Sequence, residues 1–538
     1  MSGGVTERPW HERTLGGCLA AAARAHGDRV FARFRDCTLT YAELDAAANR
    51  VANGLAALGL LQGEKVAVLL PNRPEFLFSM FGTARGGFVE VPLNTAQKGA
   101  LLQYMVADSD AAVLVVDRQW LDRVAAIAAE LPQVRVLLVT GLAPGEAVPE
   151  AGIPALPFER LLAAPATDPG VVVRHTDLQA IMYTSGTTGA SKGVTITHCH
   201  TVSFGYDWLD CTAFTTADRL YTPLPLFHAL AHTLGVVPVL LAGAEIAIVE
   251  RFSASRYWDD ARHFGSTVVH GIFGMVPMLL NQPPRPDDRD HSVRCFYIGP
   301  SSANPAFRER FGAVVVEVFG ATETGIVTCL PYGEYEPGSC GKANPRSFEV
   351  QIVDDDDTPV VPGELGEIVL RPKAPYLMTN GYYGKPEATA EAFRNLWFHT
   401  GDTGRLDAAG HLFFVDRKKD AIRRHGENVS SYEVERVVNG HPAVLESAAI
   451  AVPSEVSEDE IKICVVCRPG ETLHPAELIR FCDDRMAYFM VPRYVEVLDA
   501  LPKTPNEKVR KVELRQRGSN GITAATWDRV AAGVEVTR

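Results

Sequence analysis

The strongest constraint on the fold is a repeated alternation of amphipathic helical patterns with short apolar runs. The segment Thr40–Gly59 (TYAELDAAANRVANGLAALG) has the helical period, and Thr40 is placed to cap its first turn. The apolar run Lys65–Leu70 (KVAVLL) follows, and similar runs occupy Ala111–Val116 and Val134–Thr140. A chain in which helices separate short apolar strands is typical of an α/β fold with largely parallel sheets.

The length of the chain indicates more than one domain, because 538 residues exceed what a single hydrophobic core normally holds. The composition of the sequence changes near Asp416. The charged stretch RKKDAIRRHGEN begins a segment that has its own strand and helix patterns. We therefore expect a large domain over residues 1–416 and a small domain over residues 417–538.

Charge and apolar patterning argue against several classes of function. The chain has 52 Lys and Arg against 65 Asp and Glu, a net charge of −13, so general attraction to nucleic-acid phosphates is not expected. The first residues lack an apolar signal core, and the most apolar stretch, Gly235–Val249, is interrupted by Pro238, Gly243 and Glu245. We expect a cytoplasmic protein with neither a membrane nor a nucleic-acid partner.

One segment combines hydroxyls, glycines and a lysine at a density that suits phosphate binding. It reads YTSGTTGASKGV, from Tyr183 to Val194, and follows a short apolar run. Glycines let backbone N–H groups converge on an anion, hydroxyls add donors, and Lys192 adds a positive charge. Ser191 precedes Lys192 and no Ser or Thr follows it, so this is not a Walker A loop. The predicted phosphate-binding residues are Thr184, Ser185, Gly186, Thr187, Thr188, Gly189 and Lys192.

Further blocks follow the phosphate loop along the chain. They read FGATETG (Phe319–Gly325), WFHTGDTGRLD (Trp397–Asp407), DRKKD (Asp416–Asp420), RHGENVSSYEVE (Arg424–Glu435) and LPKTPNEKVRK (Leu501–Lys511). In this order they resemble the adenylate-forming superfamily of acyl-CoA synthetases, firefly luciferases and peptide-synthetase adenylation domains, whose phosphate loop commonly reads TSGTTGxPKG. The resemblance implies a large N-terminal domain of packed mixed and parallel sheets flanked by helices, plus a small mobile α+β C-terminal domain.

The resemblance also assigns nucleotide-binding and catalytic residues. Phe319 would lie against the adenine ring and Glu323 would bind Mg²⁺, for which a carboxylate oxygen is a suitable ligand. Lys508 would contact the carboxylate and α-phosphate oxygens in the transition state, stabilising charge where it develops. The implied catalytic residues are Lys508, Glu323, Thr322 and Lys192. Besides the loop residues, the implied ATP-binding set is Ser301, Ser302, Phe319, Gly320, Ala321, Thr322, Asp402, Arg417 and Lys508, with Asp402 and Arg417 on the ribose.

The acid and thiol sites follow from the same resemblance. The run PLPLFHALAH (Pro223–His232) resembles the PLFH block beside the acid pocket. A glycine at position 426 would let the pantetheine arm of coenzyme A pass close to the backbone. Lys419 would be the hinge of the small domain. The implied acid-binding residues are His228, Phe273, Gly274, Met275, Gly299, Pro300 and Gly325, and the implied coenzyme A tunnel is His425, Gly426 and Glu427.

These assignments predict an ATP- and Mg²⁺-dependent ligase that adenylates a small carboxylic acid, releases pyrophosphate and transfers the acyl group to coenzyme A. The PLFH, RERFG and TPNEKVRK runs place the resemblance nearest to carnitine- and crotonobetaine-CoA ligases. None of the pocket segments supplies an obvious carboxylate for a quaternary ammonium, so a small apolar or aromatic acid suits these walls at least as well.

Several alternatives stay open from the sequence. The acceptor of the activated acid could be an amine, or nitrite could be activated to diazotise an aryl amine. A peptide-synthetase adenylation domain is disfavoured because no carrier module follows Lys508. A luciferase-like oxygenase shares the fold but needs a particular acid, and a catalytically inactive nucleotide-binding protein is the alternative from another class. The oligomeric state is open, a homodimer included.

Overall fold

The computed structural model describes residues 6–184, 190–272, 275–298, 304–417, 421–455, 458–502 and 509–537. The chain divides into two compact units. The first contains residues 1–95, 106–182 and 193–416, and the second contains residues 96–105, 183–192 and 417–538.

The first unit is built on a nine-stranded sheet, counted over the described residues. The central neighbours pair in parallel, and antiparallel pairs occur only towards the two edges. In spatial order the strands are β16 (Lys342–Ala343), β15 (Gly325–Cys329), β14 (Val314–Ala321), β13 (Cys295–Ile298), β12 (Val268–His270), β10 (Arg219–Thr222), β11 (Glu245–Ile248), β1 (Val30–Arg33) and β2 (Thr38–Thr40).

Seven further strands of the described chain form a second sheet, whose pairing is parallel from β7 through to β8. Every residue of β4 and β5 is buried, as expected for parallel strands covered on both faces. In spatial order the strands are β7 (Ala155–Pro157), β6 (Val136–Thr140), β5 (Ala111–Asp117), β3 (Lys65–Leu69), β4 (Val89–Pro92), β8 (Leu178–Thr184) and β9 (Lys192–Thr197).

A third, four-stranded sheet lies late in the first unit, and β17, β18 and β19 pair in antiparallel fashion. It carries the TGD block on β19. Its strands are β17 (Phe348–Val353), β18 (Gly366–Pro372), β19 (Phe398–Leu406) and β20 (Leu412–Arg417).

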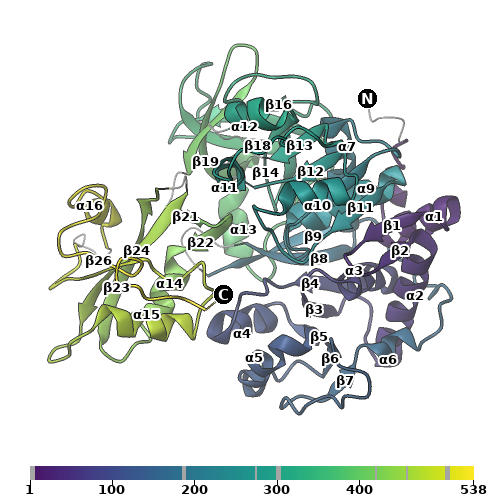
Figure 1. Cartoon of the computed structure of the whole chain (residues 1–538), viewed down its shortest axis with the longest axis horizontal. Coiled ribbons are helices and arrows are strands. Elements are labelled where there is room, and N and C mark those ends of the chain that lie inside the picture. The colour runs from purple at the N-terminus through teal and green to yellow at the C-terminus, as the bar shows by residue number, and fades with distance from the viewer. Residues whose placement is uncertain are drawn as a thin grey trace. The chain divides into compact units, whose positions relative to one another are not determined.

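Helices α1, α2 and α3 pack against one another beside the sheets (Figure 1). As predicted, Thr40 caps α2, where its side chain accepts a hydrogen bond from the Glu43 backbone and the Glu43 carboxylate reaches back to the cap. The helices before residue 417 are α1 (Leu15–His26), α2 (Tyr41–Ala57), α3 (Pro74–Gly86), α4 (Gly99–Asp108), α5 (Leu121–Ala125), α6 (Glu159–Leu162), α7 (His198–Thr212), α8 (Ala229–Ala231), α9 (Val237–Ala242), α10 (Tyr257–His263), α11 (Met275–Leu280), α12 (Asn304–Phe311) and α13 (Pro386–Ala392), with short 3₁₀ turns at η1 (Trp10–Glu12), η2 (Arg118–Trp120), η3 (Ala128–Glu130) and η5 (Arg394–Leu396) and a π-helical turn at η4 (His232–Val236).

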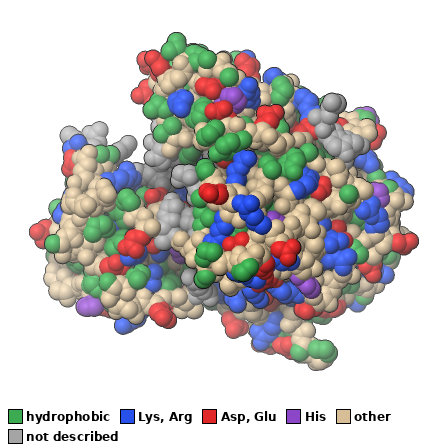
Figure 2. Space-filling view, turned by 45° about the horizontal axis from the view of Figure 1, so that its top comes forward, with side chains coloured by type: hydrophobic (Ala, Val, Ile, Leu, Met, Phe, Trp, Pro, Cys, Tyr) green, Lys and Arg blue, Asp and Glu red, His purple; other side chains and the backbone are tan. Residues whose placement is uncertain are grey.

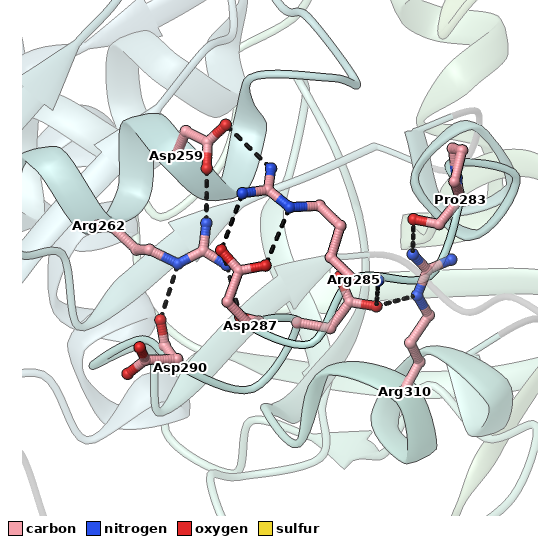
Figure 3. Close-up of polar contacts among 8 residues, drawn as sticks. Asp259, Arg262, Pro283, Arg285, Asp287, Asp290 and Arg310 are labelled. Carbon is pink, nitrogen blue, oxygen red and sulfur yellow. Dashed lines mark hydrogen bonds and ion pairs between the residues drawn. The ribbon is translucent and has the colours of Figure 1, made fainter.

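An ion-pair network ties the turn before β13 to the helices on either side of it (Figure 3). Arg285 in the turn pairs with Asp259 of α10 at 3.0 Å and with Asp287 at 2.8 Å. Arg262 pairs with Asp259 at 2.7 Å, and Arg310 of α12 pairs with Asp288 of the turn at 2.8 Å. Because most of these side chains are exposed or partly exposed and solvent screens their charges, the network fixes the path of the turn more than it stabilises the fold.

The second unit contains a separate α+β arrangement within residues 417–538. A two-stranded hairpin precedes a four-stranded sheet, and the buried faces of α14 and α15 join the same apolar cluster. The elements are β21 (Ala421–Arg424), β22 (Glu427–Ser430), α14 (Ser431–Val438), β23 (Val444–Pro453), β24 (Asp459–Cys467), α15 (Pro475–Asp483), β25 (Tyr494–Val497), α16 (Lys511–Arg515) and β26 (Trp527–Asp528).

These elements confirm the predicted fold class: a large α/β N-terminal part with mixed and parallel sheets and a smaller α+β C-terminal part. Acidic and basic side chains lie intermingled on the face shown in Figure 2. Over the described ranges of the chain, no helix combines the length and the apolar character needed to cross a membrane.

Candidate functional site

The phosphate-loop motif lies between two neighbouring strands of the seven-stranded sheet. Strand β8 ends at Thr184 and β9 begins at Lys192, so these two predicted ligands stand at the two ends of the connection. The other predicted loop residues, Ser185, Gly186, Thr187, Thr188 and Gly189, lie outside the described residues.

Ser191, at the position where the family motif commonly has Pro, has a defined role inside the second unit. Its backbone N–H donates to the Glu433 carboxylate at 2.8 Å, and its hydroxyl donates to the same oxygen. Its carbonyl accepts a hydrogen bond from Tyr104 at 2.9 Å. Burial raises the pKa of Glu433. A proline here would lack both donors and leave this buried carboxyl without them.

The FGATETG block spans the end of β14, a turn and the start of β15. The Phe319 ring is buried and stacks on Phe414, with ring centroids 6.1 Å apart. Gly320 is required by close packing, because a Cβ there would lie 2.0 Å from the Gly325 carbonyl oxygen. Ala321 is exposed and Thr322 is half-buried, so the turn after the buried ring is open to solvent.

Glu323 is held at this turn by a segment that the sequence reasoning did not select. Its backbone carbonyl accepts the Thr379 N–H at 2.8 Å, and its carboxylate accepts the Tyr382 hydroxyl at 3.1 Å. Burial raises the pKa of Tyr382 well above its ordinary value, so the phenol stays protonated and donates. The available signal was the run NGYYGKP, in which Gly381 has a φ of +123° and places the two tyrosines after a sharp turn.

The same segment is anchored to β9, the strand that follows the phosphate loop. The Thr195 hydroxyl donates to the Gly381 carbonyl at 2.7 Å, and the Thr379 hydroxyl donates to the Thr195 carbonyl at 2.9 Å. Val194 and Tyr382 form an isolated antiparallel bridge. Two motifs far apart in the sequence, the phosphate-loop strand and the Glu323 turn, are therefore joined through residues 379–382.

The arrangement around Glu323 fits a magnesium ion that accompanies a nucleotide. No group of three His, Cys, Asp or Glu that could hold a metal by itself occurs in the part of the chain that the structure describes. Mg²⁺ bound with a nucleotide needs only one or two carboxylates, because phosphate oxygens and water supply the other ligands. One positioned carboxylate, as at Glu323, meets that requirement.

The two predicted ribose ligands come from neighbouring strands. Asp402 is buried on β19, directly after Gly401, whose φ of +72° is left-handed. The Asp402 backbone N–H donates to the Thr400 hydroxyl at 3.1 Å, and that hydroxyl donates to the Ile368 carbonyl at 2.7 Å. Arg417 is the last residue of β20, the neighbour of β19. The sheet thus places the two positions on adjacent strands.

The PLFH block is fixed by Asn72, a second residue that the sequence reasoning missed. The Asn72 amide donates to the carbonyls of Leu224 at 2.9 Å and Val249 at 2.8 Å, and its oxygen accepts the Leu226 N–H at 2.8 Å. Its signal was the Pro-Asn pair, Pro71 and Asn72, that follows the apolar run of β3. His228 is half-buried and stands at the N-cap of α8.

The end of the block is anchored by a buried pair. His232 starts the π-helical turn η4, and its Nε2 lies 2.8 Å from the Glu90 carboxylate on β4. Its Nδ1 lies 3.3 Å from the Thr233 hydroxyl. Glu90 and His232 are fully buried. Glu90 belongs to the seven-stranded sheet, so this contact connects the end of the PLFH block (Pro223–His232) to that sheet.

Two other predicted acid-site residues lie in the described part of the first unit. Gly325 has a φ of +71°, and a Cβ there would lie 2.1 Å from the Phe204 ring of α7. Met275 is buried at the start of α11. The remaining candidates, Phe273, Gly274, Gly299, Pro300, Ser301 and Ser302, lie outside the described residues.

Two buried carboxyl groups near these elements ionise less readily than exposed ones. Burial raises the pKa of Glu317 on β14 and of Asp207 on α7, each to about 7. Asp207 accepts hydrogen bonds from the Asn344 amide at 2.6 Å and the Ser347 hydroxyl at 3.1 Å. Neither carboxyl is therefore a strong fixed negative charge at neutral pH.

In the second unit, the residues predicted to line the thiol tunnel form the tip of a hairpin. Strands β21 and β22 are joined by His425 and Gly426, with φ values of +54° and +81°. Two positive φ angles in a two-residue loop are typical of a type I′ turn. The Gly426 N–H donates to the Glu458 carboxylate at 3.0 Å, and Glu427 begins β22. The predicted hinge Lys419 and the predicted catalytic Lys508 lie outside the described residues.

Comparison with known proteins agrees with this layout. The family model "AMP-binding enzyme" matches residues 19–383, and the model "AMP-binding enzyme C-terminal domain" matches residues 433–508. A crotonobetaine/carnitine–CoA ligase of Salmonella paratyphi B is 33% identical over 507 residues, which cover 92% of this chain and 97% of the relative.

Two solved structures are also similar over nearly the whole chain. A double mutant of o-succinylbenzoate CoA synthetase from Bacillus subtilis has a TM-score of 0.79 and 27% identity, covering 93% of this chain and 98% of that one. An amide bond synthetase from Marinactinospora thermotolerans has a TM-score of 0.78 and 25% identity, covering 93% and 99%.

The family model that spans residues 19–383 and the relative that is 33% identical along almost the whole chain settle the family. They confirm the resemblance found in the sequence blocks. The acyl-CoA ligases of this family use ATP and Mg²⁺ and take coenzyme A as co-substrate. This chain belongs to the adenylate-forming superfamily of AMP-binding enzymes, among the acyl-CoA ligases.

Proposed function

We propose that this enzyme converts a small carboxylic acid and ATP into an acyl adenylate and pyrophosphate, and then transfers the acyl group to coenzyme A. The observation that supports this most is the link between two motifs. Residues 379–382 tie the strand after the phosphate loop to the Glu323 turn through Thr195 and Tyr382. A triphosphate held by the loop would then meet the carboxylate that suits its Mg²⁺.

In the first step, a carboxylate oxygen of the acid attacks the α-phosphorus of ATP, and the bond to the β-phosphate oxygen breaks. Thr184, Lys192 and Thr322 would hold the phosphates, and Asp402 with Arg417 would hold the ribose. Mg²⁺ bound at Glu323 would neutralise phosphate charge. Lys508 would stabilise the negative charge that develops on the reacting oxygens.

In the second step, the thiol of coenzyme A attacks the acyl carbon, AMP leaves, and the thiol proton passes to solvent. The His425–Gly426 turn and Glu427 would admit the pantetheine arm. Because Lys508 and Gly426 serve different steps, we propose that the domain of residues 417–538 turns about Lys419 relative to residues 1–416. Hinge motions of this type are common in enzymes that handle ligands.

The role of Lys508 gives the test of this proposal. Replacing Lys508 by Ala should lower pyrophosphate release about 10²–10³-fold, the usual cost of losing one group that stabilises transition-state charge. Thiolysis of supplied acyl adenylate should change little. Lys503→Ala, at an earlier lysine of the same LPKTPNEKVRK run, is the matched control and should retain both activities.

Equal losses in both half-reactions for Lys508→Ala would contradict its assigned role. Absence of pyrophosphate release by the wild-type enzyme across a broad panel of small acids would contradict the function itself. That second result would favour a nucleotide-binding protein without this activity.

The similarity to an amide bond synthetase favours one alternative acceptor. The first step would be unchanged, and an amine nitrogen would replace the thiol as the nucleophile that displaces AMP. Measuring consumption of coenzyme A against amide formation, with the same acid and an added amine, separates the two. Nitrite added with an aryl amine tests the remaining acceptor that the sequence leaves open.

A further inference from the structure

Three fully buried polar rings meet at the carboxyl end of the nine-stranded sheet. His270 is the last residue of β12, Tyr297 lies on the neighbouring strand β13, and Trp208 lies on α7. The ring centroids of His270 and Tyr297 are 5.6 Å apart, those of Trp208 and Tyr297 are 5.7 Å apart, and those of Trp208 and His270 are 5.8 Å apart. We call these three residues the ring cluster.

The polar atoms of the ring cluster have no hydrogen-bond partner in the described parts of the chain. They are both ring nitrogens of His270, the indole N–H of Trp208 and the hydroxyl of Tyr297. Native proteins rarely leave buried polar groups unpaired, and several in one place point to a group that the protein itself does not supply. Burial lowers the pKa of His270 to about 3, so the imidazole is neutral and offers one donor and one acceptor.

The strands that carry His270 and Tyr297, and their neighbour β10, lead in chain order into segments assigned to the acid. Strand β12 stands between β10, which leads into the His228 segment, and β13, which leads into residues 299–303. The carboxyl ends of parallel strands meet at one edge, where ligands bind in open α/β sheets. A Cβ on Gly235, in the π-helical turn after that segment, would lie 3.2 Å from Cε1 of His270.

Helix α7 connects the ring cluster to the other side of the same site. Phe204 precedes Trp208 by four residues, so the two side chains share one face of the helix. The Phe204 ring occupies the space beside Gly325, the predicted acid-site glycine of the FGATETG block. The ring cluster therefore lies on the helix face that extends from Gly325 to β12 and β13.

We propose that His270, together with Tyr297 and Trp208, determines specificity by hydrogen bonding a neutral polar group, such as a hydroxyl or amino group, on an aromatic acid substrate. The proposal rests on the adenylating function proposed above. The cluster offers donors and acceptors but no carboxylate. A trimethylammonium group has no hydrogen to donate and no lone pair to accept with, so it would leave these polar atoms unpaired.

The test compares acids that differ only in the polar group. Pyrophosphate release is measured with benzoate, the three hydroxybenzoates, the three aminobenzoates and crotonobetaine. At least one hydroxy- or aminobenzoate should exceed benzoate at least about tenfold in kcat/KM, since sites built to hydrogen bond a substrate reject analogues that lack the group. Crotonobetaine should be among the poorest acids.

The variants His270→Phe and Tyr297→Phe keep a planar ring and remove the polar atoms. In His270→Phe the ratio of kcat/KM for the preferred acid to that for benzoate should fall about tenfold or more, with the KM for ATP unchanged. Tyr297→Phe removes a single oxygen and should lower the ratio by a smaller factor. His263→Phe, on an exposed position of α10, is the matched control and should leave the ratio unchanged.

Three outcomes would overturn the proposal. One is a wild-type preference for benzoate or for crotonobetaine over every hydroxy- and aminobenzoate. Another is a ratio that stays at the wild-type value in both folded variants, which would assign the unpaired atoms to internal water. Failure of every acid to release pyrophosphate would remove the proposed function and this inference together, whereas the first two results leave adenylation intact.

Discussion

Two of the fully buried histidines of the first unit, His232 and His270, are paired differently. Both ring nitrogens of His232 have partners, Glu90 at 2.8 Å and Thr233 at 3.3 Å. Neither ring nitrogen of His270 has one among the described residues. Burial alone therefore does not separate a structural histidine from one that faces a ligand. The pairing of the ring nitrogens distinguishes His232, which the protein satisfies itself, from His270, for which we propose a ligand contact.

The largest effect is expected from removing the carboxylate of Glu90, which pairs with His232. Glu90→Ala removes the partner of a fully buried imidazole and should lower the free energy of unfolding by about 3–5 kcal/mol. Urea unfolding followed by tryptophan fluorescence measures it. Glu90→Gln keeps a hydrogen-bonding group of the same shape and should cost much less. A loss below about 1 kcal/mol in Glu90→Ala would show that the pair is not structural.

Replacing the buried carboxyl of Glu317 should have the opposite effect to replacing Glu90, and should stabilise the folded protein at neutral pH. Burial raises the pKa of Glu317 from 4.5 to about 7. Between these values the folded state holds a proton that the unfolded state has lost, so the stability of the folded state falls as pH rises through this range. Above pH 7 the cost is about 3 kcal/mol.

Glu317→Gln removes this titration. The difference in Tm between variant and wild type should therefore grow in favour of the variant from pH 4.5 to pH 7 and stay level above that. Thermal unfolding across this range checks it. A difference that does not change with pH would mean that Glu317 titrates normally in the folded protein.

Asn72 is an uncharged residue whose side chain makes hydrogen bonds to three backbone groups. Asn72→Ala leaves the Leu224 and Val249 carbonyls and the Leu226 N–H without this partner. We expect a loss of about 2 kcal/mol, together with a raised KM for the acid because the His228 segment is loosened. Asn53→Ala, which removes two exposed hydrogen bonds to backbone carbonyls, is the control and should cost less than half as much. Similar losses in the two variants would argue against a special role for Asn72.

The smallest effect is expected at His270. Replacing a buried polar ring that has no partner by an apolar ring of similar shape is close to neutral, so His270→Phe should change the free energy of unfolding by less than about 1 kcal/mol. His232→Phe should cost clearly more, because it leaves Glu90 buried without its partner. The same unfolding assay compares them, and equal losses would remove the distinction between the two histidines.

Much of the fold could be predicted from local patterns. The apolar runs at Lys65, Ala111 and Val134 became β3, β5 and β6, and Thr40 caps α2. The order of the motif blocks was sufficient to indicate the family. The residues that support the site could not be predicted in this way. Tyr382 contacts Glu323 across 59 positions, and His232 contacts Glu90 across 142.

The sequence by itself determined the α/β class, the helix cap and the set of motif residues, because each depends on neighbours within a few positions. Only the tertiary structure decided which side chains hold these motifs in place and which buried polar atoms stay unpaired. A histidine at position 232 and one at position 270 look alike in the sequence. Their surroundings come from strands and helices that chain crossovers bring together, and pairing depends on those surroundings.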